Sequence, residues 1–242
     1  MLLENLSYPE VELYLKEKDI ILVPVGSVEQ HSPYGLIGTD FISAEHVARQ
    51  AGEVMDILVA PTLCYGVSPH HMAFPGTVSL SPDTLIAVVC DVAQSLVTHG
   101  FRKIIFINGH GGNIAPIQVA LIQLKAKGAP GIFQLTSWYA LPGVSEICTE
   151  LYQDNDGKHA TASEVAVTMS NRPRIFKNST TKPTTVERPN YNWPLSAEEF
   201  RKTFPDGRML SAPWLATEAH GQQISNVAVK ALVSELSSML AA

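Results

Sequence analysis

Two short polar segments carry the residue types of a metal-dependent hydrolase. Glu29-Gln30-His31 is followed, nine residues after the histidine, by Asp40, and Asn108-Gly109-His110-Gly111-Gly112-Asn113 comes later in the chain. Carboxylate and imidazole ligands without thiolates suit Zn²⁺, Mn²⁺ or Fe²⁺. A metal ion held in this way can activate water for hydrolysis. The expected metal ligands are Glu29, His31, Asp40 and His110.

Both polar segments follow short apolar runs, which bring them to one place in the expected fold. The runs are 20–25 and 104–107, and both are rich in β-branched residues. Such runs are typical of buried strands in a parallel sheet. Loops that leave the carboxyl ends of these strands line the ligand crevice of open α/β sheets. We therefore expect the two carboxylates and two imidazoles to meet in one cleft.

Strand and helix patterns alternate along most of the chain. The sequence predicts strands over 20–26, 56–63, 103–107 and 131–136, and helices over 41–55, 82–99, 113–127, 161–169 and 217–240. This order favours a mainly parallel central sheet with helices on both faces. A chain of 242 residues is long enough to bury such a sheet, so residues 1–242 are expected to form a single α/β domain.

The alternating pattern is lost between residues 171 and 213, where prolines are frequent. Long irregular segments in compact domains usually serve as lids, binding loops or oligomer arms. Residues 187–214 also contain aromatic side chains of the types enriched in interfaces: Tyr191, Trp193, Phe204 and Trp214. We therefore expect a lid or oligomer arm over 171–213.

The charge pattern excludes two classes of partner. The formal net charge is −6 and no cluster of Lys and Arg is present, so neither nucleic acid nor a membrane surface is expected as a partner. The three cysteines show no CxxC spacing, the N-terminus shows no signal-peptide pattern, and no apolar run of the chain approaches membrane-spanning length. These features predict a cytoplasmic protein.

A second pair of polar residues lies at the start of the helix predicted over 161–169. Thr161-Ala162-Ser163-Glu164 has the spacing of a capping box, which would make Glu164 a helix cap. His159 precedes this helix in a polar turn. The spacing alone leaves open whether Glu164 only caps the helix or also faces the cleft.

Five ordered motifs resemble the creatininase (creatinine amidohydrolase) family. They lie at residues 25–31, 38–40, 68–77, 108–113 and 159–164. The resemblance implies a homohexameric hydrolase that opens C–N bonds with two divalent metals. It also implies that Asp40 bridges the metals, that Glu29 and His110 hold one, that His31 holds the other, and that His159 is the acid/base.

The sequence departs from creatinine-opening members of that family at two places. Gly112 stands where those members place a carboxylate ligand, so we expect Glu164 to supply the missing ligand. The stretch 153–156 lacks the tryptophan that precedes their catalytic histidine, which leaves Trp138 as a possible pocket wall. Both departures count against creatinine itself as the substrate. The expected substrate contacts are His70, Gly111, Gly112, Asn113 and Trp138.

The function predicted from these features is hydrolysis of an amide, cyclic amide or formamide by a metal-activated water. His159 would protonate the departing nitrogen of a small-molecule substrate. Three alternatives remain: a deformylase acting on a phosphorylated pyrimidine or ribotide, a peptide-processing hydrolase, and a metal-binding scaffold without catalytic activity. Backbone N–H groups of the glycine-rich loop could bind the anion of a phosphorylated substrate.

Overall fold

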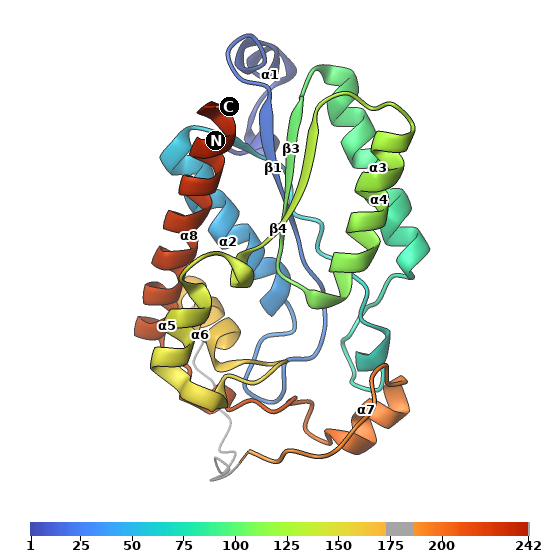
Figure 1. The fold of residues 1–242 in the computed structure, drawn as a ribbon, viewed down its shortest axis with the longest axis vertical. Helices are drawn as coiled ribbons and strands as arrows, with labels where there is room; N and C mark the ends of the chain where they lie inside the picture. Colours follow the sequence, from blue (N-terminus) through green and yellow to red (C-terminus); the bar gives the residue numbers. More distant parts are fainter. Residues whose placement is uncertain (173–185, 242) are drawn as a thin grey trace.

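A parallel four-stranded sheet forms the centre of the chain (Figure 1). The computed structural model describes residues 1–172 and 186–241. Within these residues the strands lie in the order β2-β1-β3-β4, and every neighbouring pair is parallel. Their bounds are Ile20–Val25 for β1, Leu58–Val59 for β2, Lys103–Asn108 for β3 and Ile132–Ser137 for β4. The predicted α/β fold is confirmed.

Helices cover both faces of this sheet, as expected (Figure 1). One face packs against α2 (Thr39–Met55), α5 (Val144–Tyr152), α6 (Ala162–Asn171) and α8 (Glu218–Ala241). The other packs against α1 (Tyr8–Tyr14), α3 (Pro82–His99) and α4 (Ile114–Ala126). Short 3-10 helices lie at Leu3–Asn5, Pro69–His71, Gly111–Asn113, Trp138–Ala140, Gln153–Asn155 and Pro213–Leu215.

The two-residue period of the strands explains this layering. In β1, Ile20 and Leu22 belong to the hydrophobic cluster under α2 and α8, whereas Ile21 and Val23 belong to the cluster under α3 and α4. Successive side chains of a strand point to opposite faces of the sheet. Because both faces are covered, every residue of β1 is buried, which is why the strand is a continuous apolar run rather than an alternating one.

The predicted helix boundaries hold where capping residues mark them, and some elements were missed. Ser81 caps α3 by accepting a hydrogen bond from Thr84 N, and Gly100 ends the helix with a φ of +112°. The strand expected over 56–63 forms only at Leu58–Val59. Gly38 holds the N-cap position of α2, and no side chain caps this helix. The sequence did not predict α1, α5 or α7 (Ala197–Thr203).

The last helix, α8, is long and apolar enough to cross a membrane by length and composition. The expectation that no segment approaches that length therefore does not hold for this helix. In the structure α8 packs against α6, α2 and α5, and its apolar stripe is buried in the core. Core helices pass the same test of length and composition. The buried stripe consists of Ile224, Ala228, Leu232 and Leu236.

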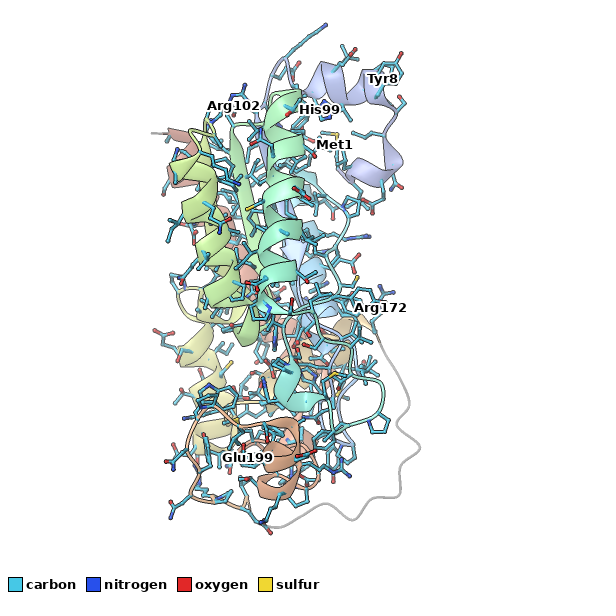
Figure 2. All side chains as sticks on the ribbon, turned by 90° about the vertical axis from the view of Figure 1, so that its right-hand side faces the viewer. Met1, Tyr8, His99, Arg102, Arg172 and Glu199 are labelled. Atoms are coloured by element: carbon cyan, nitrogen blue, oxygen red, sulfur yellow. The ribbon has the colours of Figure 1, made fainter. Side chains whose placement is uncertain are left out.

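The segment expected to be a lid or oligomer arm is partly structured. Its residues 173–185 lie outside the described residues. Beyond them, α7 lies at the opposite end of the molecule from His99 and Arg102, as the label on Glu199 shows (Figure 2). Phe200 and Phe204 of this region form a small buried cluster with Phe74 and Met209.

Most aromatic residues of this segment pack within the chain rather than outward. Tyr191 lies edge-to-face on Phe204, and Trp214 packs against Tyr34. Trp193 differs, because it is 55% exposed. Phe204 is buried and Tyr191 and Trp214 are partly buried by these contacts within the chain. A role of the four aromatics in subunit contacts stays a prediction.

Two glycines seat the first turn of α2 against the ends of the central strands. A Cβ on Gly109, which follows β3, would lie 2.1 Å from the Asp40 carbonyl oxygen. A Cβ on Gly26, which follows β1, would lie 2.3 Å from the Phe41 nitrogen. Only glycine allows this close backbone approach. The approach places Asp40 at the carboxyl ends of β1 and β3.

We predict that Gly109→Ala lowers the free energy of unfolding by about 1–3 kcal/mol, because the methyl group must displace the α2 backbone. Urea denaturation of metal-free protein measures this change. Gly111→Ala in the same loop is the control, because its Cβ would be 3.9 Å from the nearest atom, Tyr139 Oη. Equal stability of the two variants would show that the contact at Asp40 relaxes freely.

Candidate metal centre

Acidic and imidazole side chains from separate segments meet at the carboxyl end of the sheet. Five of them are buried, and Glu164 is partly buried. The loop after β1 supplies two, the first turn of α2 supplies one, the loop after β3 supplies one, and the start of α6 with its preceding turn supplies two. These residues are Glu29, His31, Asp40, His110, His159 and Glu164.

Asp40 belongs to two groups of possible ligands. Ligand atoms of Glu29, Asp40 and His110 all lie within 4.8 Å of one another, and so do those of His31, Asp40 and Glu164. Asp40 Oδ2 is 3.2 Å from His110 Nδ1, whereas Asp40 Oδ1 is 3.0 Å from His31 Nε2. One carboxylate oxygen thus faces each group, which is the arrangement a bridging ligand needs.

The electrostatics of the cluster fit a bound cation. Burial opposes the charged form of His31, but Asp40 raises its pKa to about 9. Burial likewise opposes charge on His110, yet Glu29 and Asp40 raise its pKa well above the ordinary value. Burial also opposes ionisation of Asp40, while the two imidazoles lower the pKa of its carboxyl. The metal-free cluster therefore retains protons where a divalent ion would supply positive charge.

Two buried atoms of this cluster, His31 Nε2 and Asp40 Oδ2, have no hydrogen-bond partner within the described residues beyond the ion pairs of Asp40 with His31 and His110. They lie in the two ligand groups. A buried polar atom is costly unless another interaction satisfies it. The residues therefore fit bound divalent metal.

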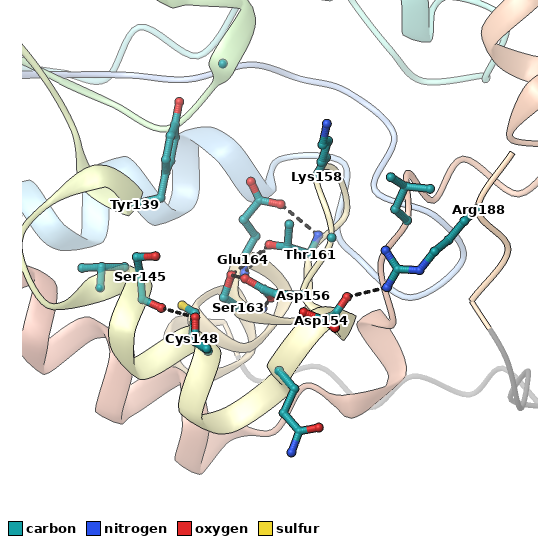
Figure 3. A pocket seen from close by; sticks show the side chains of 16 residues that line it. Tyr139, Ser145, Cys148, Asp154, Asp156, Lys158, Thr161, Ser163, Glu164 and Arg188 are labelled. Carbon is teal, nitrogen blue, oxygen red and sulfur yellow. Dashed lines mark hydrogen bonds between the residues drawn. The ribbon is translucent and has the colours of Figure 1, made fainter. Parts of the chain in front are cut away.

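Glu164 combines the two roles that the sequence left open. Its carboxylate Oε2 accepts a hydrogen bond of 3.0 Å from Thr161 N, and Thr161 Oγ1 accepts one of 3.1 Å from Glu164 N (Figure 3). The predicted capping box is therefore confirmed. The same carboxylate lies in the ligand group of His31 and Asp40. Burial raises the pKa of Glu164 to about 7, so a nearby cation would favour its charged form.

The Gln30 backbone determines which nitrogen of His159 faces the centre. His159 Nε2 lies 2.8 Å from the Gln30 carbonyl oxygen, which can only accept a hydrogen bond. The Gln30 side-chain amide nitrogen also lies 2.9 Å from His159 Nε2, so Gln30 holds this edge of the ring and Nδ1 faces Glu29 Oε1 at 3.5 Å. Burial, together with charge on His31, lowers the pKa of His159 well below its ordinary value. Neutral His159 thus presents a free nitrogen to the centre.

The Gln30 side chain, which the sequence analysis passed over, links a further histidine to the site. Its Nε2 contacts His71 Nδ1 at 3.0 Å and donates to the Gly207 carbonyl oxygen at 2.9 Å. His71 stacks on His159 with ring centroids 4.1 Å apart. The motif at 68–77 contains two adjacent histidines, and the sequence analysis predicts a substrate contact only at His70. Both line the cavity, and His71 is the buried one.

A cavity of about 500 Å³ opens over this cluster, and we call it the metal-site cavity. Three of the expected substrate contacts line it, namely His70, Gly111 and Gly112. Tyr191 and Trp193 line it as well, so part of the segment expected to be a lid lies against the site. Its full lining is Glu29, Asp40, His70, His71, His110, Gly111, Gly112, Ala115, Lys158, His159, Glu164, Tyr191, Trp193 and Met209.

Two expected substrate contacts are corrected by the structure. Trp138 is fully buried in the hydrophobic cluster beneath α5 and α8, so it forms core rather than pocket wall. Asn113 is also fully buried; its side chain donates to the Gly26 carbonyl oxygen and accepts from Val67 N. Asn113 therefore joins three loops together and is not available to a substrate.

The structure also explains the glycine at position 112. A Cβ there would lie 2.2 Å from the Val67 carbonyl oxygen and 2.4 Å from His110 Nε2. A carboxylate side chain has no room at this position. The neighbouring loop has closed over it, so no ligand can come from position 112.

Comparison with known proteins identifies the family of the chain. The family model described as "Creatininase: Creatinine amidohydrolase" matches residues 4–236. The chain belongs to the creatininase family. One solved creatininase, a mutant complexed with creatine, has a TM-score of 0.84 and 24% identity, with 98% of both chains covered. Another, described as creatinine amidohydrolase (creatininase), has a TM-score of 0.82 and 25% identity, covering 98% of this chain and 97% of that one.

The chain spans about half the length of the curated relatives that it matches, and these relatives differ in function. A "Mycofactocin precursor peptide peptidase" of Mycolicibacterium smegmatis is 37% identical over 115 residues, which are 45% of this chain and 46% of that protein. A "3-dehydro-scyllo-inosose hydrolase" of Thermotoga maritima is 32% identical, covering 56% and 44%. "Creatinine amidohydrolase" of Pseudomonas putida is also 32% identical, covering 51% and 52%. These relatives support a hydrolase and leave the substrate open.

We predict that metal-free protein loses thermal stability as pH rises from about 6.5 to about 9. The pKa of His31 is near 6.5 in the unfolded chain and is raised to about 9 in the fold. Its stabilising contribution is therefore complete below 6.5 and is lost as pH rises through 9. Melting temperatures of chelated protein across this range measure the loss. Metal-loaded protein is the control and should not lose stability, because deprotonated ligands bind metal better. A flat profile for chelated protein would contradict the paired state of His31.

We predict that Asp40→Ala loses more metal than any other single substitution in the site, because both ligand groups lose a carboxylate oxygen. Glu164→Gln should lose one metal and keep the other, since its amide still accepts the capping hydrogen bond but binds a hard cation poorly. Metal quantification on protein purified without chelators tests both variants, with Glu150→Gln on the exposed face of α5 as control. Two metals in folded Asp40→Ala would remove the bridging role.

Proposed function

We propose that this protein is a metal-dependent amidohydrolase that cleaves a C–N bond with two divalent ions, Zn²⁺, Mn²⁺ or Fe²⁺. The observation that carries the proposal is the position of Asp40 between two buried ligand groups. Glu29, Asp40 and His110 would hold one ion, and His31, Asp40 and Glu164 the other. Related solved creatininases, one described with Mn and one as a Zn-Zn type, support this choice of metals.

The bound metals would activate water and polarise the substrate carbonyl oxygen. The protein's own residues would manage the protons. With Nε2 tied to the Gln30 carbonyl oxygen, His159 has Nδ1 free to accept a proton and to pass it to the leaving nitrogen. His71, stacked on this ring and bound to the Gln30 amide, limits its rotation. Amide cleavage requires a proton for the leaving nitrogen, and His159, held in a fixed orientation, would deliver it.

The substrate we propose is an amide in a linear chain, with a peptide as the leading candidate, rather than creatinine. Two observations support this choice. The position that carries a carboxylate in creatinine-opening relatives is Gly112, where the Val67 carbonyl oxygen leaves no room for one. One curated relative is also named a peptide peptidase. We also propose a cytoplasmic location, which the three free cysteines support.

We also propose a homo-oligomer, a hexamer as the family resemblance implies. Trp193 supports a contact at the mouth of the metal-site cavity, because it is 55% exposed and lies edge-to-face on His70. Large exposed aromatics are enriched where subunits meet.

We predict that His159→Ala keeps both metals and lowers kcat by about 10²–10⁴-fold, the usual effect of removing a positioned acid/base. The assay is a panel of dipeptides, formamides and cyclic amides with the metal-loaded enzyme. His99→Ala, exposed at the opposite end of the molecule, is the control (Figure 2). Loss of a metal in His159→Ala would instead make this residue a ligand, as its closeness to Glu29 and His31 allows. Two bound metals without activity on any amide would favour a non-catalytic scaffold.

A further inference from the structure

A second cavity of about 550 Å³ adjoins the metal-site cavity, and we call it the Tyr139 cavity (Figure 3). It lies along α5 and the turn that precedes α6. The two cavities share Gly111, Lys158 and Glu164. Because Glu164 also belongs to a ligand group of the metal centre, the second cavity begins where the proposed chemistry takes place.

The wall of the Tyr139 cavity is built for hydrogen bonds. Tyr139 Oη is buried, lies beside Gly111 and interacts with Ser137. Ser145 and Thr149, one turn apart on α5, are exposed into the same space. A hydroxyl can both donate and accept hydrogen bonds, so Tyr139 keeps capacity to pair with a ligand.

The lining of the Tyr139 cavity carries charged groups of both signs. They are the cations Lys158 and Arg188 and the carboxyl groups of Asp154, Asp156 and Glu164. Arg188 donates a hydrogen bond to the Asp154 carbonyl oxygen. The Asp156 carboxylate is already satisfied, since its two oxygens accept hydrogen bonds of 2.8 Å from Ser163 N and Oγ. A strongly charged group such as a phosphate therefore finds no dominant countercharge. Main-chain amides, which both donate and accept hydrogen bonds, fit this wall better.

We infer that the Tyr139 cavity is a second substrate subsite, which holds the part of a peptide that extends from the cleaved bond past Glu164. The inference rests on the proposed amidohydrolase function. Each cavity alone has the volume of a small-molecule pocket. A cyclic amide would fill only the metal-site cavity. A peptide with several residues uses both, so the paired cavities select an oligopeptide over a dipeptide.

The test compares hydrolysis of two randomised peptide pools, dipeptides and pentapeptides, by metal-loaded enzyme with mass-spectrometric detection of products. Ser145→Trp places a large side chain in the Tyr139 cavity, and Glu150→Trp, exposed on the same helix but outside the cavity lining, is the matched control. Tyr139→Phe removes only the hydroxyl. Melting temperature and metal content verify that each variant is folded.

The wild type is expected to favour pentapeptides in kcat/KM by at least about 10-fold, which corresponds to one net hydrogen bond of about 1.4 kcal/mol. Ser145→Trp should abolish this preference by raising KM for pentapeptides, and Tyr139→Phe should reduce the preference through the same parameter, whereas Glu150→Trp should keep it. Equal preference in wild type and Ser145→Trp would overturn the second subsite while leaving the amidohydrolase function intact. Hydrolysis of neither pool would overturn the second subsite together with the proposed peptide substrate.

Discussion

The structure depends on one carboxylate, that of Asp40, which has an imidazole against each of its oxygens. Its position follows from backbone contacts rather than from its own side chain. The first turn of α2 sits against glycines at the ends of β1 and β3, so the helix cannot shift without a clash. Because no side chain caps α2, the carboxylate is free to serve the centre. The carboxyl ends of β1 and β3 and the first turn of α2 thereby hold a buried carboxylate in place. Without its imidazole partners this buried charge would be unfavourable.

The sequence could predict the central strands, the ends of α3 and the clustering of the site residues because local features mark them. Apolar runs bounded by glycine and proline mark β1 and β3, and Ser81 with Gly100 marks both ends of α3. Since parallel strands end at one edge of the sheet, the residues after them were expected together, and they are. The capping box at Thr161 and Glu164 was equally local. Which metal these residues bind, and how many ions, stays a prediction.

What the sequence could not predict depends on packing between distant segments. Trp138 is a large aromatic residue of the kind that often lines a pocket. Only the arrangement of α5 and α8 shows that it belongs to the hydrophobic core. Gln30 lies between two expected ligands, and its contacts with His71 and His159 span 41 and 129 residues of sequence. Both depend on tertiary contacts rather than on local propensity. The short α7 is different, because Ser196 and Glu199 form a capping box that is visible in the sequence; Phe200 then packs against Phe74 and Met209.

The lack of space at Gly112 limits the number of protein ligands in the proposed metal centre. With no side chain possible there, each proposed ion keeps three protein ligands, one of them shared. Three protein ligands leave a position open for water or substrate on each ion, as in other catalytic metal sites. Geometry and availability rather than affinity decide which ion occupies such a site. The composition of the centre would thus depend on the metal supply of its host.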